Sequence, residues 1–264
     1  CSWEEAIENI DIGGPSMIRS AAKNHTDVAV LVDPNQYKDY IEEIKKGRLN
    51  KNYKIKLAFE AFQHTASYDS AISNWMSKEK DLIPTNLIES FPLIKELRYG
   101  ENPHQRGSVY STSLIENKVN QLSGKKLSYN NYNDLYSALI ISKSLPKNKG
   151  TVIVKHANPC GVSINKDKIE SYHLALKCDP LSSFGGIVAC NFKIGKGLAL
   201  ELNKVFFEII IGNGFDKNAL KILKKKKNLR IIDSSELKNK EILSYNSNFN
   251  TLLLQTADNL KFSS

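Results

Sequence analysis

Residues 151–161 read Thr-Val-Ile-Val-Lys-His-Ala-Asn-Pro-Cys-Gly and are the most informative segment of this chain. Its first four residues are β-branched or apolar, which is the pattern of a short buried strand. The Asn-Pro and Cys-Gly pairs that follow predict that this strand ends abruptly. Helical and strand-like patterns alternate over the rest of the chain, and this alternation favours an α/β fold.

Two polar residues, Lys155 and His156, stand at the end of the predicted strand. In open α/β sheets the carboxyl ends of the strands face the ligand crevice. Histidine exchanges protons near neutral pH, and a neighbouring lysine can donate a proton or hold developing negative charge. The pair is therefore a candidate catalytic site. The alternative is that these residues only lead the strand into solvent.

Outward from this strand, the spacing of apolar residues predicts helices on both sides of it. The predicted helices cover residues 15–23, 33–47, 54–75, 132–145, 167–178, 197–207 and 216–227. Further short strands are predicted at residues 28–32, 187–190 and 209–211. Residues 77–93 mix polar side chains with Pro84 and Pro92, which is typical of a linker between domains.

Composition and length bound the class of protein. The chain has 264 residues, of which 41% are hydrophobic, so it can bury a core. It contains no apolar run of about 18 residues, the length of a membrane span, and no signal peptide. We therefore expect a soluble cytoplasmic protein. Because the sequence begins at Cys1 in a glutamate-rich stretch, and not at methionine, we also expect a fragment of a longer polypeptide.

The net charge of +9 comes from 37 basic and 28 acidic residues. Only five of the basic residues are arginines, which nucleic-acid binders favour for bidentate contacts. The lysines are scattered, apart from a run at residues 224–227 that ends a predicted helix, where cations suit the helix dipole. This pattern favours a solvated lysine-rich surface. A nucleic-acid-binding module remains an alternative, and a steep salt dependence of oligonucleotide affinity would support it.

The four cysteines form no C-x-x-C pair and are too few for a disulfide scaffold in a chain of this length. They are Cys1, Cys160, Cys178 and Cys190. A Pro-Cys pair after a strand also occurs in zinc deaminases, whose signatures are H-x-E and P-C-x-x-C. The residue three after Cys160 is Ser163, and the sequence contains no H-x-E. The sequence therefore predicts no metal site.

A second candidate site lies near the start of the chain. Gly13 and Gly14 form a predicted turn into a helix, whose free N–H groups and dipole favour an anion such as phosphate. Asp11 precedes the glycines and Lys23 follows on the helix, so a carboxylate and an ammonium are available as acid and base. The alternative is a capping Asp11 and a solvated basic stripe of Arg19 and Lys23.

Three later loops carry groups that suit a nucleotide. The Arg98-Tyr99-Gly100 turn can clamp a phosphate through its guanidinium and backbone N–H groups. The amides of residues 128–131 can read the edge of a carboxamide or heterocycle. Phe184, in the Ser-Ser-Phe-Gly-Gly segment at 182–186, can stack on a planar base. The alternative for each loop is an ordinary surface role, or for Phe184 packing beneath its loop.

Taken together and in this order, these segments resemble the bifunctional purine-biosynthesis family. In that family an AICAR (phosphoribosylaminoimidazolecarboxamide) formyltransferase is joined to an IMP (inosine monophosphate) cyclohydrolase. The segments that carry the resemblance are residues 8–15 (Glu-Asn-Ile-Asp-Ile-Gly-Gly-Pro), 21–25 (Ala-Ala-Lys-Asn-His), 64–69 (His-Thr-Ala-Ser-Tyr-Asp), 98–105 (Arg-Tyr-Gly-Glu-Asn-Pro-His-Gln), 127–130 (Leu-Ser-Tyr-Asn), 154–161 and 179–186.

The resemblance implies a domain organisation. Residues 1–78 would be the end of the cyclohydrolase domain, which has a methylglyoxal-synthase-like α/β fold. Residues 79–95 would be a linker. Residues 96–264 would be the amino-terminal part of the formyltransferase domain, whose halves have a cytidine-deaminase-like fold without zinc.

The resemblance also implies residue roles. The family's formyltransferase lysine and histidine fall on Lys155 and His156, and its cyclohydrolase acid and base residues fall on Asp11 and Lys23. We expect the substrate-binding residues to be Arg98, Tyr99, Asn131, Phe184, Gly185, Glu208, Gly13 and Gly14.

The implied activity is formyl transfer from 10-formyltetrahydrofolate to AICAR, followed by cyclisation of the formylated nucleotide to IMP, without a metal. The implied partners are AICAR and formyl-AICAR nucleotides, folate and a second copy of the complete protein, and neither nucleic acid nor a membrane. The fragment alone is expected to be inactive. A single-function formyltransferase with a degenerate partner domain remains an alternative.

Overall fold

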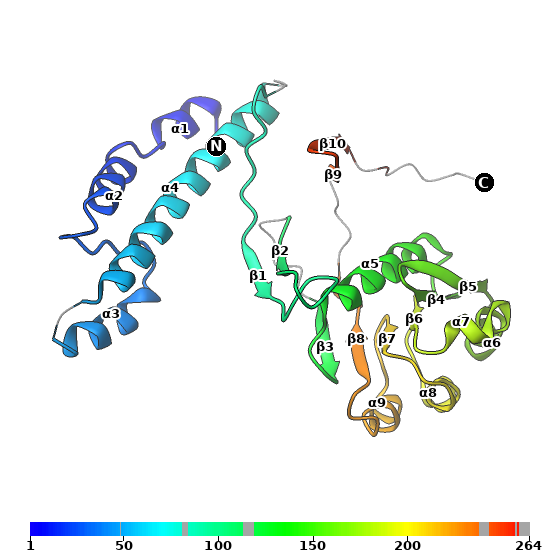
Figure 1. The fold of residues 1–264 in the computed structure, drawn as a ribbon. Coiled ribbons are helices and arrows are strands. Elements are labelled where there is room, and N and C mark those ends of the chain that lie inside the picture. The colour runs from blue at the N-terminus through cyan, green and yellow to red at the C-terminus, as the bar shows by residue number, and fades with distance from the viewer. Residues whose placement is uncertain (48, 81–83, 113–118, 238–242, 257, 259–264) are drawn as a thin grey trace. The chain divides into compact units, whose positions relative to one another are not determined.

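The computed structural model describes residues 1–47, 49–80, 84–112, 119–237, 243–256 and 258. The chain divides into two compact units, Cys1–Phe91 and Pro92–Ser264 (Figure 1). The division falls inside the predicted linker 79–95, while the assignment of the units to the family's domains stays a prediction. None of the helices in the described ranges is long and apolar enough to serve as a membrane span.

The first unit is built from helices. They are α1 (Trp3–Glu8), α2 (Gly13–Lys23), α3 (Gln36–Lys45) and α4 (Lys51–Glu79). Helix α2 packs along α4 through Ala22, Ala58 and Ala61, whose small side chains allow the two backbones to approach closely. Trp3 stacks on Trp75 with ring centroids 4.5 Å apart, which fastens α1 to the far part of α4.

Two predictions for this unit are wrong. Residues 28–32 do not form a strand, because no strand among the unit's described residues pairs with them, and Val30 and Val32 instead pack against the α2–α4 cluster. Helix α2 begins at Gly13, two residues before Pro15. Gly13 and Gly14 therefore belong to the first helical turn and do not form a turn ahead of the helix. The predicted helices at 33–47 and 54–75 correspond to α3 and to the longer α4.

The second unit contains a six-stranded mixed sheet with the order β3-β8-β7-β6-β4-β5. The strands are β3 (Asn120–Ser123), β4 (Gly150–Lys155), β5 (Asn158–Ile164), β6 (Ile187–Cys190), β7 (Ile209–Gly212) and β8 (Arg230–Asp233). β6, β7 and β8 are parallel to one another, while β4 is antiparallel to both of its neighbours and β3 is antiparallel to β8. The expected α/β class is confirmed.

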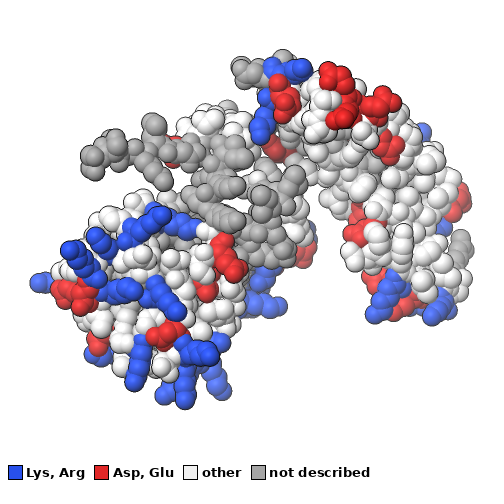
Figure 2. Space-filling view, turned by 180° about the vertical axis from the view of Figure 1, so that it is seen from behind, with Lys and Arg blue, Asp and Glu red and all other residues white. Residues whose placement is uncertain are grey.

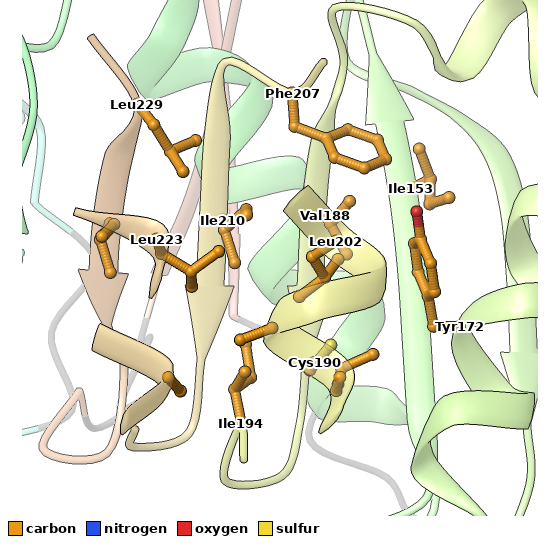
Figure 3. Packing of buried hydrophobic residues seen from close by; sticks show 14 of the residues in the cluster. Ile153, Tyr172, Val188, Cys190, Ile194, Leu202, Phe207, Ile210, Leu223 and Leu229 are labelled. Carbon is orange, nitrogen blue, oxygen red and sulfur yellow. The ribbon is translucent and has the colours of Figure 1, made fainter. Parts of the chain in front are cut away.

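Both faces of this sheet are covered by helices (Figure 1). The helices are α5 (Tyr129–Ser144), α6 (Lys168–Cys178), the short α7 (Pro180–Ser183), α8 (Lys196–Lys204) and α9 (Lys217–Leu223). Because side chains alternate along a strand, Val152 packs with Leu135 of α5 on one face, while Ile153 packs with Tyr172 of α6 and Leu202 of α8 on the other (Figure 3). The predicted helices and strands of this unit are confirmed, with bounds shifted by a few residues at their ends.

The predicted end of the central strand is only half right. β4 does end at Lys155, but residues 158–164 return beside it as β5, so Asn158 and Pro159 lie inside a strand. Proline is tolerated there because β5 is the last strand of the sheet and one side of it needs no hydrogen-bond donor. Two separate hairpin-like sheets complete the unit. They are β1 (Leu93–Glu96) with β2 (Ser108–Tyr110), and β9 (Leu243–Asn248) with β10 (Thr251–Thr256).

Candidate active site at one edge of the sheet

Most of the predicted formyltransferase residues gather at one edge of the sheet. Val154 of β4 pairs with Ile187 at the start of β6, which aligns with Ile209 at the start of β7 and Arg230 at the start of β8. Lys155 therefore lies at the carboxyl end of its strand, as predicted. The three parallel strands present their amino ends at this edge, because β4 runs against them.

His156 and Ala157 form the two-residue turn of the β4–β5 hairpin. Both have positive φ, 53° and 59°, although neither is glycine. A two-residue hairpin of this kind strongly prefers Asn-Gly, so the His-Ala pair costs conformational energy. The turn is held by the Asp134 carboxylate of α5, which accepts a 2.7 Å hydrogen bond from the Ala157 N–H. The imidazole thus projects from a strained turn that α5 holds in place.

The contact between Asp134 and the turn supports a structural prediction. Replacing Asp134 by alanine is expected to speed amide hydrogen exchange in residues 155–158 about tenfold. The reason is that the partly buried hydrogen bond from the Ala157 N–H to the charged carboxylate is lost. Exchange measured by mass spectrometry checks this. The matched control is Asp167→Ala, which removes the capping carboxylate of α6 instead. Unchanged exchange in the turn of Asp134→Ala would show that the contact does not hold it.

Lys155 connects this turn to the loop that carries Phe184. Lys155 is half-buried, and its Nζ donates a 3.0 Å hydrogen bond to the backbone oxygen of Phe184. Phe184 is 61% exposed, and its ring centroid lies 5.4 Å from that of the half-exposed Phe206. Gly185, with φ +76°, donates through its N–H to the Phe206 oxygen at 2.8 Å. The alternative that Phe184 packs beneath its loop is wrong, because its ring is mostly open to solvent.

Glu208 and Asn131 meet at the same edge. The Asn131 amide nitrogen donates a 2.9 Å hydrogen bond to Oε2 of Glu208, and its oxygen accepts from the Ser128 N–H at 3.2 Å in the capping box of α5. Asn131 is only 6% exposed. Arg230 Nη1 lies 3.5 Å from the same Glu208 oxygen. Sequence reasoning missed Asp134 and Arg230, because nothing near them in sequence marks either residue.

Arg98 and Tyr99 lie in a tight loop that precedes this sheet. The loop is closed by a 2.8 Å hydrogen bond from the Gly100 N–H to the Gln105 oxygen. The exposed Arg98 guanidinium stands 5.7 Å from the centroid of the Tyr99 ring. A 3.4 Å hydrogen bond from Asn130 to the Glu101 oxygen connects the loop to the start of α5. The loop is thus tied to the helix that also supplies Asn131.

The predicted cyclohydrolase residues lie on α2 in the first unit. Asp11 Oδ1 accepts a 3.0 Å hydrogen bond from the Gly14 N–H, and the Asp11 N–H donates to the Tyr68 hydroxyl at 2.8 Å. A side chain on Gly14 would collide with the Asp11 carboxylate and would displace it from this position. Lys23 ends the same helix, and about 1.5 Å of rise per residue puts the backbones of Asp11 and Lys23 more than about 15 Å apart.

Asp11 also borders a pocket of about 120 Å³ in the first unit. The pocket is lined by Asp11, Pro15, Ile18, His64, Thr65 and Tyr68. Lys23 is not among its lining residues. The structure therefore brings Asp11 together with His64 and Tyr68, and leaves Lys23 at the opposite, exposed end of α2.

The described residues add three observations, on metal ligands, on thiols and on charge. Within the described ranges, no three His, Cys, Asp or Glu side chains are grouped so that they could hold a metal ion. Burial raises the pKa of Cys160, and it raises the pKa of Cys190 to about 12. Figure 2 shows lysines and arginines spread over the visible face of the larger unit, with acidic residues among them.

Comparison with known proteins gives one consistent result. The family described as "AICARFT/IMPCHase bienzyme" matches residues 21–264. The chain is 58% identical, over 98% of its length, to the bifunctional purine biosynthesis protein PurH of Prochlorococcus marinus strain MIT 9515. It is 53% identical to the protein of the same name from Prochlorococcus marinus subsp. pastoris. In both cases the match covers 52% of the relative, so the chain spans about half the length of these curated relatives.

Proposed function

Because the chain belongs to the AICARFT/IMPCHase bienzyme family, we propose that it serves purine biosynthesis in two steps. A formyl group passes from 10-formyltetrahydrofolate to AICAR, and the formylated nucleotide then closes to IMP. Residues 1–78 are assigned to the end of a methylglyoxal-synthase-like cyclohydrolase domain and 79–95 to a linker. Residues 96–264 are assigned to a cytidine-deaminase-like part of the formyltransferase.

The observation that carries the formyl-transfer step is the arrangement around Lys155 and His156. The 5-amino group of AICAR is a poor nucleophile, because its lone pair is delocalised toward the ring carboxamide. His156 takes a proton from this amine as the amine attacks the formyl carbon. Lys155, oriented by the Phe184 oxygen, stabilises the oxyanion or assists the departure of the folate nitrogen. Both groups reach the same edge of the sheet from consecutive positions.

The nucleotide contacts follow from the charges at this edge. Arg98 offers a guanidinium to the phosphate, with Tyr99 beside it. Phe184 offers an exposed ring on which a planar heterocycle can stack, and the chain bends at Gly185 next to it. Glu208 accepts hydrogen bonds from the ligand, and Asn131 supports it.

The second step needs proximity and proton transfer, since the carboxamide nitrogen attacks the formyl carbon and water then leaves. We assign these proton transfers to Asp11 and Lys23. Gly13 and Gly14 begin α2, where the helix dipole favours an anion; the Gly14 N–H is donated to Asp11 Oδ1, which leaves the Gly13 N–H for the ligand. His64 and Tyr68 border the same pocket as Asp11, which makes this end of α2 the better supported part of the assignment.

We further propose a cytoplasmic homodimer that uses AICAR, formyl-AICAR and folate, with no metal and no role for nucleic acid or membranes. The test is to combine the full-length protein with AICAR and 10-formyltetrahydrofolate and to follow the nucleotides by chromatography. Formation of IMP is the expected result. Formyl-AICAR that accumulates without IMP would favour the single-function alternative, and recovery of unchanged AICAR would refute both.

The division of labour between the two sites can be checked in the same assay. Lys23→Ala is expected to reduce the conversion of formyl-AICAR to IMP by about 10²-fold and to leave formyl transfer unchanged, because only the first site loses a proton-transfer group. Lys51→Ala, at the start of α4, is the control, and it should change neither rate. Equal losses of both activities in Lys23→Ala would indicate misfolding and would contradict the assignment.

A further inference from the structure

Arg230 has no assigned role in the reaction, but its side chain contacts Glu208 of the candidate site. The side chain is 14% exposed, and its Nη1 lies 3.5 Å from Oε2 of Glu208. Its Nε donates to the Lys126 oxygen at 3.4 Å. Burial lowers the pKa of Arg230 below its usual value, and the Glu208 carboxylate offsets part of this shift. A guanidinium largely removed from water is costly unless an acceptor offsets the loss, and Glu208 is the charged acceptor present.

Glu208 is held from a second side by a residue that is itself fixed. Asn131 donates to the same oxygen, Oε2, at 2.9 Å, while its own oxygen is occupied by the Ser128 N–H. The Glu208 side chain remains 45% exposed. One carboxylate oxygen is therefore anchored by two donors, and the described residues give the other, Oε1, no hydrogen bond. Oε1 is therefore held in one orientation and is available to accept a hydrogen bond from a ligand.

We propose that Arg230 is a positioning residue that, together with Asn131, fixes the Glu208 carboxylate as an acceptor for an uncharged N–H or O–H group of the nucleotide. The inference rests on the function proposed above. A carboxylate repels the phosphate of a nucleotide, so the group that Glu208 accepts from is a hydroxyl, amine or amide. Arg230 does not touch this group. It acts by holding the carboxylate in one orientation before the nucleotide arrives.

A double-mutant cycle in the full-length protein tests this inference. Arg230→Met keeps an unbranched apolar stem and removes the guanidinium donors, while Glu208→Gln removes the charge that Arg230 holds. Each single variant is expected to raise the KM for AICAR about tenfold with a smaller change in kcat, because a charge-assisted hydrogen bond is lost or misdirected. The double variant should be no worse than Glu208→Gln alone, since Arg230 acts through Glu208.

Two further variants separate positioning from folding. Arg230→Lys keeps a cation near Glu208 and should recover part of the lost affinity. Lys193→Met, beyond the opposite end of β6, is the control for loss of a surface cation and should leave the KM unchanged. Additive effects of Arg230→Met and Glu208→Gln, or an equal loss of thermal stability and activity in Arg230→Met without recovery by lysine, would overturn the inference.

The same measurements distinguish its failure from that of the proposed function. If the parent protein converts AICAR but Glu208→Gln binds it with unchanged KM, the role of Glu208 and Arg230 is refuted while the reaction stands. If the parent protein leaves AICAR unchanged, the proposed function itself is refuted.

Discussion

Replacement of His156 by alanine is expected to lower kcat for formyl transfer by about 10²–10⁴-fold, the range that a positioned general base contributes. The dissociation constant for AICAR should change little, because the phosphate and ring contacts that we propose lie on other segments. Alanine also carries a Cβ, so the backbone strain at φ 53° is the same in both proteins and the variant isolates the imidazole. Steady-state kinetics and calorimetric titration with AICAR measure the two quantities.

The control for this variant is His173→Ala. His173 is an exposed histidine of α6 whose Nε2 lies 3.5 Å from Glu201, and its removal should leave kcat unchanged. Added imidazole should restore part of the activity of His156→Ala and none to other slow variants. Turnover of AICAR by His156→Ala at the parental rate would show that another group takes the proton.

The second large effect is expected on folding. A Cβ added to Gly161 would stand 1.9 Å from the backbone oxygen of Ala175 and 3.2 Å from the Cβ of Cys178. The first neighbour is backbone of α6, so it cannot turn aside as a side chain would. Gly161→Ala is therefore expected to lower the free energy of unfolding by about 3 kcal/mol, at the upper end of the cost of overpacking. Urea unfolding followed by circular dichroism measures this.

Gly197→Ala serves as the matched control for the same substitution. Its added Cβ would meet only the terminal Cδ1 of Ile169, at 3.2 Å, which can move. Because alanine favours the helix α8 by up to about 1 kcal/mol over glycine, the net change should be small and of either sign. A Gly161→Ala protein as stable as Gly197→Ala would mean that β5 and α6 are not packed as closely as described.

Helices were predicted well from the sequence because their apolar spacing repeats over several turns. The strand errors have two separate causes. Residues 28–32 are apolar and β-branched, but a strand needs a partner, and a single stretch of sequence cannot reveal whether one exists. Residues 158–164 contain proline and glycine, which argue against a strand. Proline is tolerated because β5 is an edge strand, and glycine is needed at position 161 because the backbone of α6 lies too close for a side chain.

The residue pattern alone reveals the candidate catalytic pair only because its two groups are neighbours in sequence, whereas Glu208 was expected only from the family resemblance. Lys155 and His156 stand together at the end of a clear strand, so their pattern was visible. The pairing of Glu208 with Asn131 joins residues 77 positions apart, and no local pattern announces it. Arg230 and Asp134 belong to a short strand and to the middle of a helix. Each is recognised only from its contact with a distant segment, Asp134 with the Ala157 N–H and Arg230 with Glu208.

The long separations within this cluster also bear on how the protein is made. The hydrogen bond from Arg230 to the Lys126 oxygen spans 104 positions, so the ribosome must deliver β8 before that oxygen and the Glu208 carboxylate gain their partner. Until then, a nascent chain carries the Lys126 oxygen and the Glu208 carboxylate without the guanidinium that contacts them. Vectorial synthesis therefore makes this corner of the sheet one of the last to close, and a prematurely terminated product would be exposed to proteolysis there.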